Sequence, residues 1–305
     1  MTDLKTKVGS LVLKNPVVLA SGTCGYGEVF EDFFPARKVG AIVTKGVSLE
    51  PRPGNPPPRI CETESGMLNS IGLENVGVEK FISEKLPWLR RNKVTTIVNI
   101  FGEKAGEYLR LAEILDREPG VSGLELNLSC PNVKKGGLEF GRDEKAVAEI
   151  TSGVKEKTSL AVWVKLSASR SDPAALALAA QSAGADAVVI SNTLKGMAID
   201  LEKRRPLLAP VTGGLSGPAI KPVALAAVFE AARKVKIPVV ACGGIFSGRD
   251  ALEFLLAGAA AVELGTACLV NPLAAVEIIR EMGNYLDRAR VQSLKEWVGK
   301  IELDR

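Results

Sequence analysis

The sequence predicts an α/β fold in which eight parallel strands, each followed by a helix, close into a (β/α)8 barrel. The first observation is that short runs rich in Val, Ile, Leu and Ala alternate with longer stretches whose apolar residues recur at helical spacing. The second is their number, because eight such strands are enough to close a parallel sheet on itself. The third is size, since 305 residues that are 46% hydrophobic accommodate one barrel as a single domain over 1–305.

The predicted elements follow one another in regular order. The strands cover residues 17–20, 41–44, 95–100, 123–128, 161–166, 185–190, 238–242 and 260–264. The outer helices cover residues 103–116, 144–157, 173–183, 218–235 and 272–286.

Two segments exceed the minimal barrel. Residues 5–14, with Gly9 and Ser10 as the turn, predict an N-terminal β-hairpin that caps the barrel bottom. A long loop follows the second strand, where residues 50–58 hold five prolines and a glycine and are too irregular for helix or strand. This loop continues through residues 66–73. Loops of this length are usually functional, so we expect it to bind a ligand or to cover the site.

Composition excludes several classes of function. A formal charge of +4 and a charged fraction of 24% do not provide the concentrated basic face of a nucleic-acid binder. The N-terminal residues lack the apolar core of a signal peptide, and no apolar run approaches the ~20 residues that a membrane span requires. We therefore expect a soluble, cytoplasmic protein that binds a small ligand, with no nucleic-acid or membrane partner.

The titratable residues restrict the chemistry. The chain has no histidine, so proton transfer must fall to Cys, Lys, Asp, Glu or Tyr, and no metal site is expected. Its five cysteines are scattered without a C-x-x-C pair, which predicts free thiols and no iron–sulfur cluster on this chain. Cys24, Cys242 and Cys268 are expected to be small buried hydrophobes, and Cys61 has no assignment.

The predicted strands end in small or polar residues, at the positions where (β/α)8 barrels carry their active sites. Two lysines and three asparagines would converge on one rim, where they cost free energy unless a ligand satisfies them. Polar residues also cap strands in ordinary loops, and that reading stays open for any one position. The strand ends are Ser21-Gly22, Lys45-Gly46, Asn99, Asn127, Lys165, Ser191-Asn192, Gly243-Gly244 and Gly265-Thr266.

Glycine turns after the last three strands predict a phosphate site. Gly243-Gly244 and Gly265-Thr266 each lead into a helix, and the loops after strands seven and eight form the recurrent phosphate site of this barrel. Residues 213–217 contain three glycines and are expected to add a third flexible turn. The ligand predicted from these turns is a phosphorylated cofactor or sugar.

Cys130 differs from the other cysteines because it follows strand four, on a loop over the predicted barrel mouth. The run from Asn127 to Gly137 reads N-L-S-C-P-N-V-K-K-G-G, and two prospective site lysines would share the environment of the thiol. A proton-accepting thiol needs access and support for its thiolate form. Cys130 is therefore the candidate catalytic base.

This run resembles the catalytic loop of the class 1 dihydroorotate dehydrogenases. Further segments match that family in the same order and span nearly the whole chain, which is far more specific than any one of them. They are S-G-T-C-G-Y-G at 21–27, T-K-G-V-S at 44–48, N-S-I-G-L-E-N at 69–75, N-T-L-K-G-M-A-I-D at 192–200, T-G-G-L-S-G-P-A-I-K-P at 212–222 and G-G-I at 243–245.

The resemblance implies one FMN per chain and oxidation of dihydroorotate to orotate in pyrimidine biosynthesis. Cys130 would remove a proton from C5 while hydride leaves C6 for the flavin, and Lys165 would stabilise the negative charge of the reduced flavin. The FMN phosphate would lie on Gly217, Gly243, Gly244, Gly265 and Thr266, with the ring near Ser21, Lys45, Gly46, Asn99, Asn127, Lys165 and Ser191. Dihydroorotate or orotate would be held by Lys45, Asn69, Ser70, Ile71, Gly72, Leu73, Asn127, Asn132, Asn192 and Thr193.

The segments at 69–75 and 129–137 resemble the NAD-linked class 1B branch more than the fumarate-linked branch. That resemblance implies an electron-transfer subunit that carries FAD and a [2Fe–2S] cluster, in a heterotetramer built on a catalytic homodimer. The scattered cysteines and the lack of a dinucleotide fingerprint in this chain agree with such a division of labour.

Two departures from the family and three alternative functions remain. Ala168-Ser169 stands where the family usually has Pro-Asn, which bears on substrate fit and loop rigidity, and Cys24 replaces a commoner Phe as a packing change.

The first alternative function is a flavin domain like that of dihydropyrimidine dehydrogenase, acting on uracil or thymine. The second is a flavin barrel like tRNA dihydrouridine synthase. The third is a catalytically silent scaffold.

Overall fold

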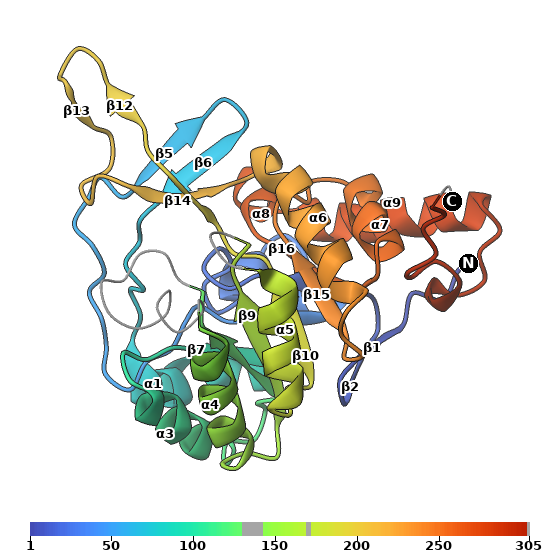
Figure 1. The fold of residues 1–305 in the computed structure, drawn as a ribbon, viewed down its shortest axis with the longest axis horizontal. Coiled ribbons are helices and arrows are strands. Elements are labelled where there is room, and N and C mark those ends of the chain that lie inside the picture. Colours follow the sequence, from blue (N-terminus) through green and yellow to red (C-terminus); the bar gives the residue numbers. More distant parts are fainter. Residues whose placement is uncertain (130–142, 169–171, 304–305) are drawn as a thin grey trace.

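The structure confirms the predicted barrel. The computed structural model describes residues 1–129, 143–168 and 172–303. Within them, eight strands form a closed ring in which all neighbouring strands are parallel, and helices surround the ring (Figure 1). Each strand lies within two residues of its predicted range. The strands are β3 (Val17–Leu19), β4 (Ala41–Val43), β7 (Thr96–Ile100), β8 (Gly123–Asn127), β9 (Ala161–Leu166), β10 (Ala187–Ile190), β15 (Val239–Cys242) and β16 (Ala259–Leu264).

Two apolar cores stabilise the barrel. The larger lies between the strands and the helices, and the smaller fills the barrel interior around Trp163. The hairpin of β1 (Thr6–Val8) and β2 (Leu11–Leu13) contributes Val8 and Leu13 to the interior core, so it closes the barrel bottom as predicted. Polar residues are therefore concentrated at the other end, where the strands finish.

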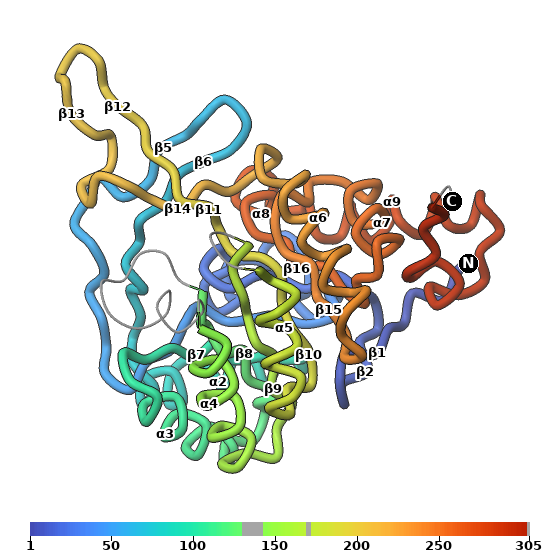
Figure 2. The backbone as a smooth tube through the Cα atoms, viewed as in Figure 1, coloured from blue at the N-terminus to red at the C-terminus, as the bar shows by residue number. Residues whose placement is uncertain are grey.

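The outer helices follow the barrel strands, and their ring is visible in the tube view (Figure 2). Helical turns in the crossover from β4 to β7 were not predicted, because each is too short to show a periodicity: α1 (Gly77–Lys80), the π-helical η3 (Phe81–Lys85) and α2 (Leu86–Arg91). None of these helices, nor any other in the described residues, combines the length and the apolar character that a membrane span requires. The other helices are α3 (Ala105–Leu115), α4 (Glu144–Lys155), α5 (Pro173–Ser182), α6 (Lys221–Ala232), α7 (Gly248–Leu256), α8 (Thr266–Val270) and α9 (Ala274–Arg288), with short 3-10 turns η1 (Glu28–Phe30), η2 (Ala36–Lys38), η5 (Pro218–Ile220) and η6 (Leu294–Glu296).

A second, antiparallel sheet lies beside the barrel where the sequence predicted only loops (Figure 1). Its strand order is β11 (Leu194–Gly196), β14 (Gly213–Ser216), β6 (Gly66–Asn69) and β5 (Ile60–Thr63). The predictions of a flexible turn at 213–217 and of a loop throughout 66–73 were therefore wrong. Glycine has a low strand propensity and so concealed β14, yet close packing requires it, because a Cβ at Gly213 would lie 2.6 Å from the Asn69 carbonyl oxygen.

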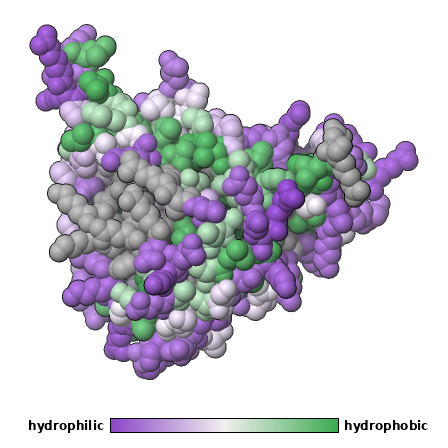
Figure 3. All heavy atoms as spheres, viewed as in Figure 1, coloured by the Kyte–Doolittle hydropathy of each residue, from purple (hydrophilic) through white to green (hydrophobic). Residues whose placement is uncertain are grey.

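An arm projects from this sheet and carries the short strands β12 (Ile199–Asp200) and β13 (Arg205–Pro206) (Figure 1). Ile199 is 55% exposed and Leu201 is 85% exposed, and the space-filling view shows apolar side chains on this arm (Figure 3). Exposed apolar groups of this kind are typical of surfaces that contact another chain.

A capping box fixes the loop between β15 and α7. The Asp250 backbone N–H donates to Ser247 Oγ at 3.1 Å, and the Ser247 N–H donates back to Asp250 Oδ2 at 2.9 Å. Lys221 on α6 also pairs with the Asp250 carboxylate. Burial would raise the pKa of Asp250, but the hydrogen bonds from Lys221, Phe246 and Ser247 outweigh it and lower the pKa.

We expect Asp250→Asn to lower the free energy of unfolding by about 1–2 kcal/mol at pH 7, because it weakens the cap and removes the partner of Lys221. The folded pKa of Asp250 is depressed, so its stabilisation is present above the unfolded pKa of about 3.9 and is lost as the pH falls through the folded value. Urea titrations at pH 7 and pH 3 measure this. The exposed Asp32→Asn is the control, and an equal loss at both pH values would contradict the assignment.

Candidate active site

The carboxyl ends of the barrel strands surround a cavity of about 440 Å³. The antiparallel sheet contributes one wall through Ile60, Met67 and Asn69. Most predicted site residues line this cavity. They are Ser21, Lys45, Gly46, Asn69, Ile71, Gly72, Leu73, Asn99, Asn127, Lys165, Ser191, Asn192, Thr193, Gly217, Gly243, Gly244, Gly265 and Thr266.

Three predicted site residues are not among the lining residues. Ser70 is fully buried, and its backbone N–H donates to the Arg59 carbonyl oxygen at 2.8 Å. Cys130 and Asn132 lie outside the described residues, so their roles remain predictions.

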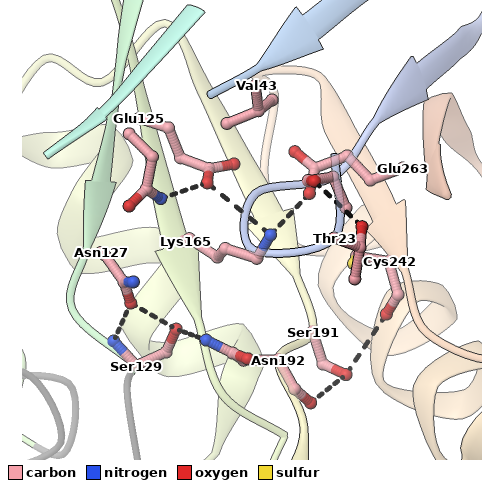
Figure 4. A network of polar contacts seen from close by, with 12 residues as sticks. Thr23, Val43, Glu125, Asn127, Ser129, Lys165, Ser191, Asn192, Cys242 and Glu263 are labelled. Atoms are coloured by element: carbon pink, nitrogen blue, oxygen red, sulfur yellow. Dashed lines mark hydrogen bonds and ion pairs between the residues drawn. The ribbon is translucent and has the colours of Figure 1, made fainter. Parts of the chain in front are cut away.

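A buried lysine and two buried glutamates form a polar cluster at the cavity, in which Lys165 and Glu263 belong to the cavity floor and Glu125 lies behind it (Figure 4). Lys165 Nζ on β9 lies 2.5 Å from Glu263 Oε2 on β16 and 3.6 Å from Glu125 Oε1 on β8. Asn99 on β7 donates from Nδ2 to Glu125 Oε1 at 2.6 Å. The four side chains form one polar cluster, and Lys165, Glu263 and Asn99 line the cavity.

The surroundings of this cluster keep Lys165 charged. Burial raises the pKa of Glu125 well above its ordinary value, and the charge of Glu263 raises it further. Burial alone would lower the pKa of Lys165, but negative charge on its neighbours, which are Cys242 once that thiol ionises, Glu125 and Glu263, outweighs burial and raises the pKa. Lys165 is therefore an ammonium ion at neutral pH, placed to stabilise negative charge on a ligand.

Glu125 and Glu263 were not among the predicted site residues. Each stands in an otherwise apolar strand run, L-E-L at 124–126 and V-E-L at 262–264. A strand that is buried on both faces carries a charged residue only where a partner compensates for it. Two such positions in one predicted barrel were the signal that could have identified the pair.

A chain of amide and hydroxyl groups joins β8 to the segment after β10 (Figure 4). Asn192 donates from Nδ2 to Ser129 Oγ at 2.9 Å, and the Ser129 backbone N–H donates to Asn127 Oδ1 at 3.4 Å. The Asn192 side chain also accepts from the Thr193 backbone N–H at 2.8 Å. These contacts fix two amides, Asn127 and Asn192, which can bind both donor and acceptor edges of a ligand.

Two cations share one carboxylate at another part of the cavity. Glu74 Oε2 lies 2.5 Å from Arg59 Nη2 and 3.8 Å from Lys45 Nζ, and all three residues line the cavity. The three formal charges sum to +1, so this corner favours an anionic ligand group. Arg59 and Glu74 were not among the predicted site residues, because they belong to the long loop after the second strand, whose shape the sequence does not determine.

Glycine backbone lines a further part of the cavity. Gly243 and Gly244 have φ of 125° and 75°, which residues with a Cβ rarely adopt. A Cβ at Gly244 would lie 2.5 Å from the Lys221 Cβ, whereas one at Gly265 would meet nothing nearer than 3.7 Å. Thr266 Oγ1 donates to Ser216 Oγ at 2.8 Å. The glycine turns thus leave backbone groups open to a ligand, as a phosphate requires.

The three cysteines that were predicted to be buried fall into two groups. Cys24 and Cys268 are buried, as predicted, and burial raises the pKa of the Cys268 thiol to about 12. Cys242 is only partly buried and lines the cavity, so the prediction of a plain core position was wrong for it. It is the last residue of β15, where the barrel wall meets the cavity. Desolvation there raises the pKa of Cys242 to about 12, so its thiol stays protonated.

Comparisons with known proteins agree along the length of the chain. The family model described as dihydroorotate dehydrogenase matches residues 3–286. A protein of Geotalea daltonii named dihydroorotate dehydrogenase B (NAD(+)), catalytic subunit, is 52% identical over 301 residues, which cover 99% of each chain. Proteins of the same name from Geotalea uraniireducens and Geobacter sulfurreducens are 53% identical over 299 residues and 52% identical over 301 residues, covering 98% and 99% of both chains respectively.

We expect Lys165→Met to lower the free energy of unfolding by about 3 kcal/mol at pH 8, because it leaves two buried carboxyls without their cation. The pKa of Glu125 is raised above its unfolded value near ~4.3, so the penalty for ionising it grows as the pH rises. The loss should therefore be smaller at pH 5.5, as denaturant titrations at both pH values will measure.

The matched control is Lys155→Met, which removes the partner of the partly exposed Asp186. This variant should cost about 1 kcal/mol or less at either pH. A Lys165→Met loss that does not change between pH 5.5 and pH 8 would argue against the carboxyl cluster.

Proposed function

The chain belongs to the dihydroorotate dehydrogenase family, as a catalytic subunit of the NAD-linked type, and we propose that it oxidises dihydroorotate at the barrel cavity. The observation that carries this proposal is identity of about 52% over nearly the whole length of chains that bear this name. The product would be orotate, an intermediate of pyrimidine synthesis.

FMN fits the residues that line the cavity. Asn99 lines the cavity, and its buried Oδ1 accepts no hydrogen bond from the described residues, so it lacks the donor that a ligand N–H, such as that of a flavin ring, would supply. The turns at Gly217, Gly243-Gly244 and Gly265-Thr266 would hold the phosphate through backbone groups. When bound, FMN would supply the acceptor for the hydride that leaves the substrate.

The remaining residues would bind and orient the substrate. Lys45 and Arg59 would attract the substrate carboxylate, because their two positive charges exceed the single negative charge of Glu74, which both contact. Asn69, Asn127 and Asn192 would pair with the pyrimidine edges. Lys165 would stabilise negative charge at the cavity floor. Ser21, Gly46 and Ser191 would contact the flavin ring, and Ile71, Gly72, Leu73 and Thr193 the substrate.

Cys130 is proposed as the base that removes the C5 proton. Cys130 directly follows Ser129 in the sequence, and the Ser129 hydroxyl accepts a hydrogen bond from Asn192, which lines the cavity. We also propose substrate contacts for Asn132 from the sequence.

We propose an electron-transfer partner that carries FAD and a [2Fe–2S] cluster, in a heterotetramer on a catalytic homodimer. The names of the relatives, which include both NAD(+) and catalytic subunit, support a second subunit. The sequence of this chain has no cysteine cluster for iron and sulfur. The exposed apolar arm at Ile199 and Leu201 is suited to contact between chains.

The direct test is anaerobic titration of the purified, FMN-loaded chain with dihydroorotate, followed by flavin absorbance. We expect the flavin to bleach with dihydroorotate but not with dihydrouracil, which lacks the carboxylate. Equal reduction by dihydrouracil would instead favour a uracil-type or thymine-type activity.

Lys45→Met should weaken dihydroorotate binding by about tenfold to a hundredfold, because it removes a charge-assisted contact.

Cys130→Ser should slow flavin reduction by dihydroorotate about 100-fold or more at pH 7, because a hydroxyl is a poor base without a histidine. The wild-type rate should rise with pH as the thiol, ordinarily near pKa ~8.5, ionises. Stopped-flow absorbance measures both. Cys61→Ser, at a partly buried position on β5, is the control and should react like the wild type. An unchanged rate in Cys130→Ser would exclude this base.

A further inference from the structure

Two glutamates approach one lysine from opposite sides of the barrel (Figure 4). Glu125 is on β8 and Glu263 is on β16, and these strands are four places apart in either direction around the ring β10-β15-β16-β3-β4-β7-β8-β9. Lys165, on β9, lies between the two carboxyls. Glu263 and Lys165 line the cavity, whereas Glu125 does not.

The hydrogen bonds of the two carboxyls are incomplete. Glu125 Oε1 accepts from Asn99 and Glu263 Oε2 accepts from Lys165, at 2.6 and 2.5 Å. The second oxygens, Glu125 Oε2 and Glu263 Oε1, are buried and accept nothing from the described residues. Both carboxyl groups lie within ion-pair distance of Lys165 Nζ, and the charge of Glu263 raises the pKa of Glu125. Ionised carboxylates only accept, so a proton on one of them would supply the missing donor.

The charges around the cluster lead to the same conclusion. Among residues 1–129, 143–168 and 172–303, the other titratable groups that face it are the thiols of Cys242 on β15 and Cys24 after β3. Both thiols are neutral, because desolvation raises the pKa of Cys242 to about 12 and that of Cys24 further still. With both glutamates ionised, the cluster would carry an uncompensated negative charge in a buried site. One bound proton brings its net charge to zero.

We propose that Glu125 and Glu263 share one proton, and that Glu263 is a positioning residue that holds the Lys165 ammonium group at the cavity floor. This proposal rests on the proposed function, because a reaction that leaves negative charge on a flavin is favoured by an ammonium group and opposed by surplus carboxylate beside it. Glu263 acts through Lys165, since its Oε2 accepts a hydrogen bond from Lys165 Nζ at 2.5 Å.

Infrared difference spectroscopy of the full chain tests the shared proton. Of the 35 acidic side chains, only a buried protonated one gives a carboxylic acid C=O band at pH 7.5, and this band shifts in heavy water. We expect the band in the wild type and its loss in both Glu263→Gln and Glu125→Gln, since one carboxylate is then left to pair with Lys165. The exposed Glu84→Gln control should keep the band. Absence of the band from the wild type, or its persistence in Glu263→Gln, would overturn the proposal.

FMN binding tests the positioning role. Glutamine keeps an acceptor for Lys165 and a donor for Glu125, whereas leucine keeps neither. The FMN dissociation constant should stay within about threefold of wild type in Glu263→Gln and rise roughly tenfold or more in Glu263→Leu. Equal affinities in the two variants would overturn the positioning role.

Two features keep these tests separate from other failures. If Glu263→Leu does not fold, the infrared comparison of the glutamine variants still decides the shared proton. Neither measurement needs turnover. A wild-type chain that binds FMN but is not reduced by dihydroorotate would therefore contradict the proposed function, while the band would still report on the carboxyls.

Discussion

The site depends on one electrostatic constraint, which is that a lysine inside a closed barrel must be neutralised by its neighbours. Lys165 is almost fully buried, and only carboxylates from other strands can compensate its charge there. Closure of the ring meets this need, because it brings β8 and β16 to face each other across the barrel interior. The same closure directs all strand ends to one mouth. The charged floor and the cavity above it are thus two results of one topology.

The cavity combines regions of different chemistry around this floor. Lys45 and Arg59 give one corner a positive balance, the glycine turns expose backbone, and the amides of Asn127 and Asn192 are fixed by mutual contacts through Ser129. These regions are suited to an anionic group, a polar ring and a phosphate, carried by one ligand or by two. The FMN and carboxylated pyrimidine that we propose for this cavity would supply these groups between them.

The sequence predicted the barrel well because its strands are short apolar runs, and burial on both faces leaves little ambiguity about them. It predicted the glycine and asparagine positions because strand ends of a parallel barrel share one rim. It did not predict β14 and β6, because glycines and a nearby proline-rich segment are unfavourable for strands. The second sheet forms only through pairing between segments that are far apart in the sequence. It also failed at Glu125 and Glu263, because only three-dimensional closure brings these residues to Lys165. Arg59 and Glu74 were missed because they belong to the long loop after the second strand, whose shape the sequence does not determine.

A crystal structure of the chain with FMN and orotate would show where both ligands bind. We expect the flavin ring beside Lys165 and Asn99, its phosphate on the turns at Gly217, Gly243-Gly244 and Gly265-Thr266, and the orotate carboxylate at Lys45. We also expect Cys130 Sγ to face C5 of the pyrimidine. A flavin bound away from the Lys165 cluster, or a Cys130 thiol turned away from the pyrimidine, would contradict this expectation.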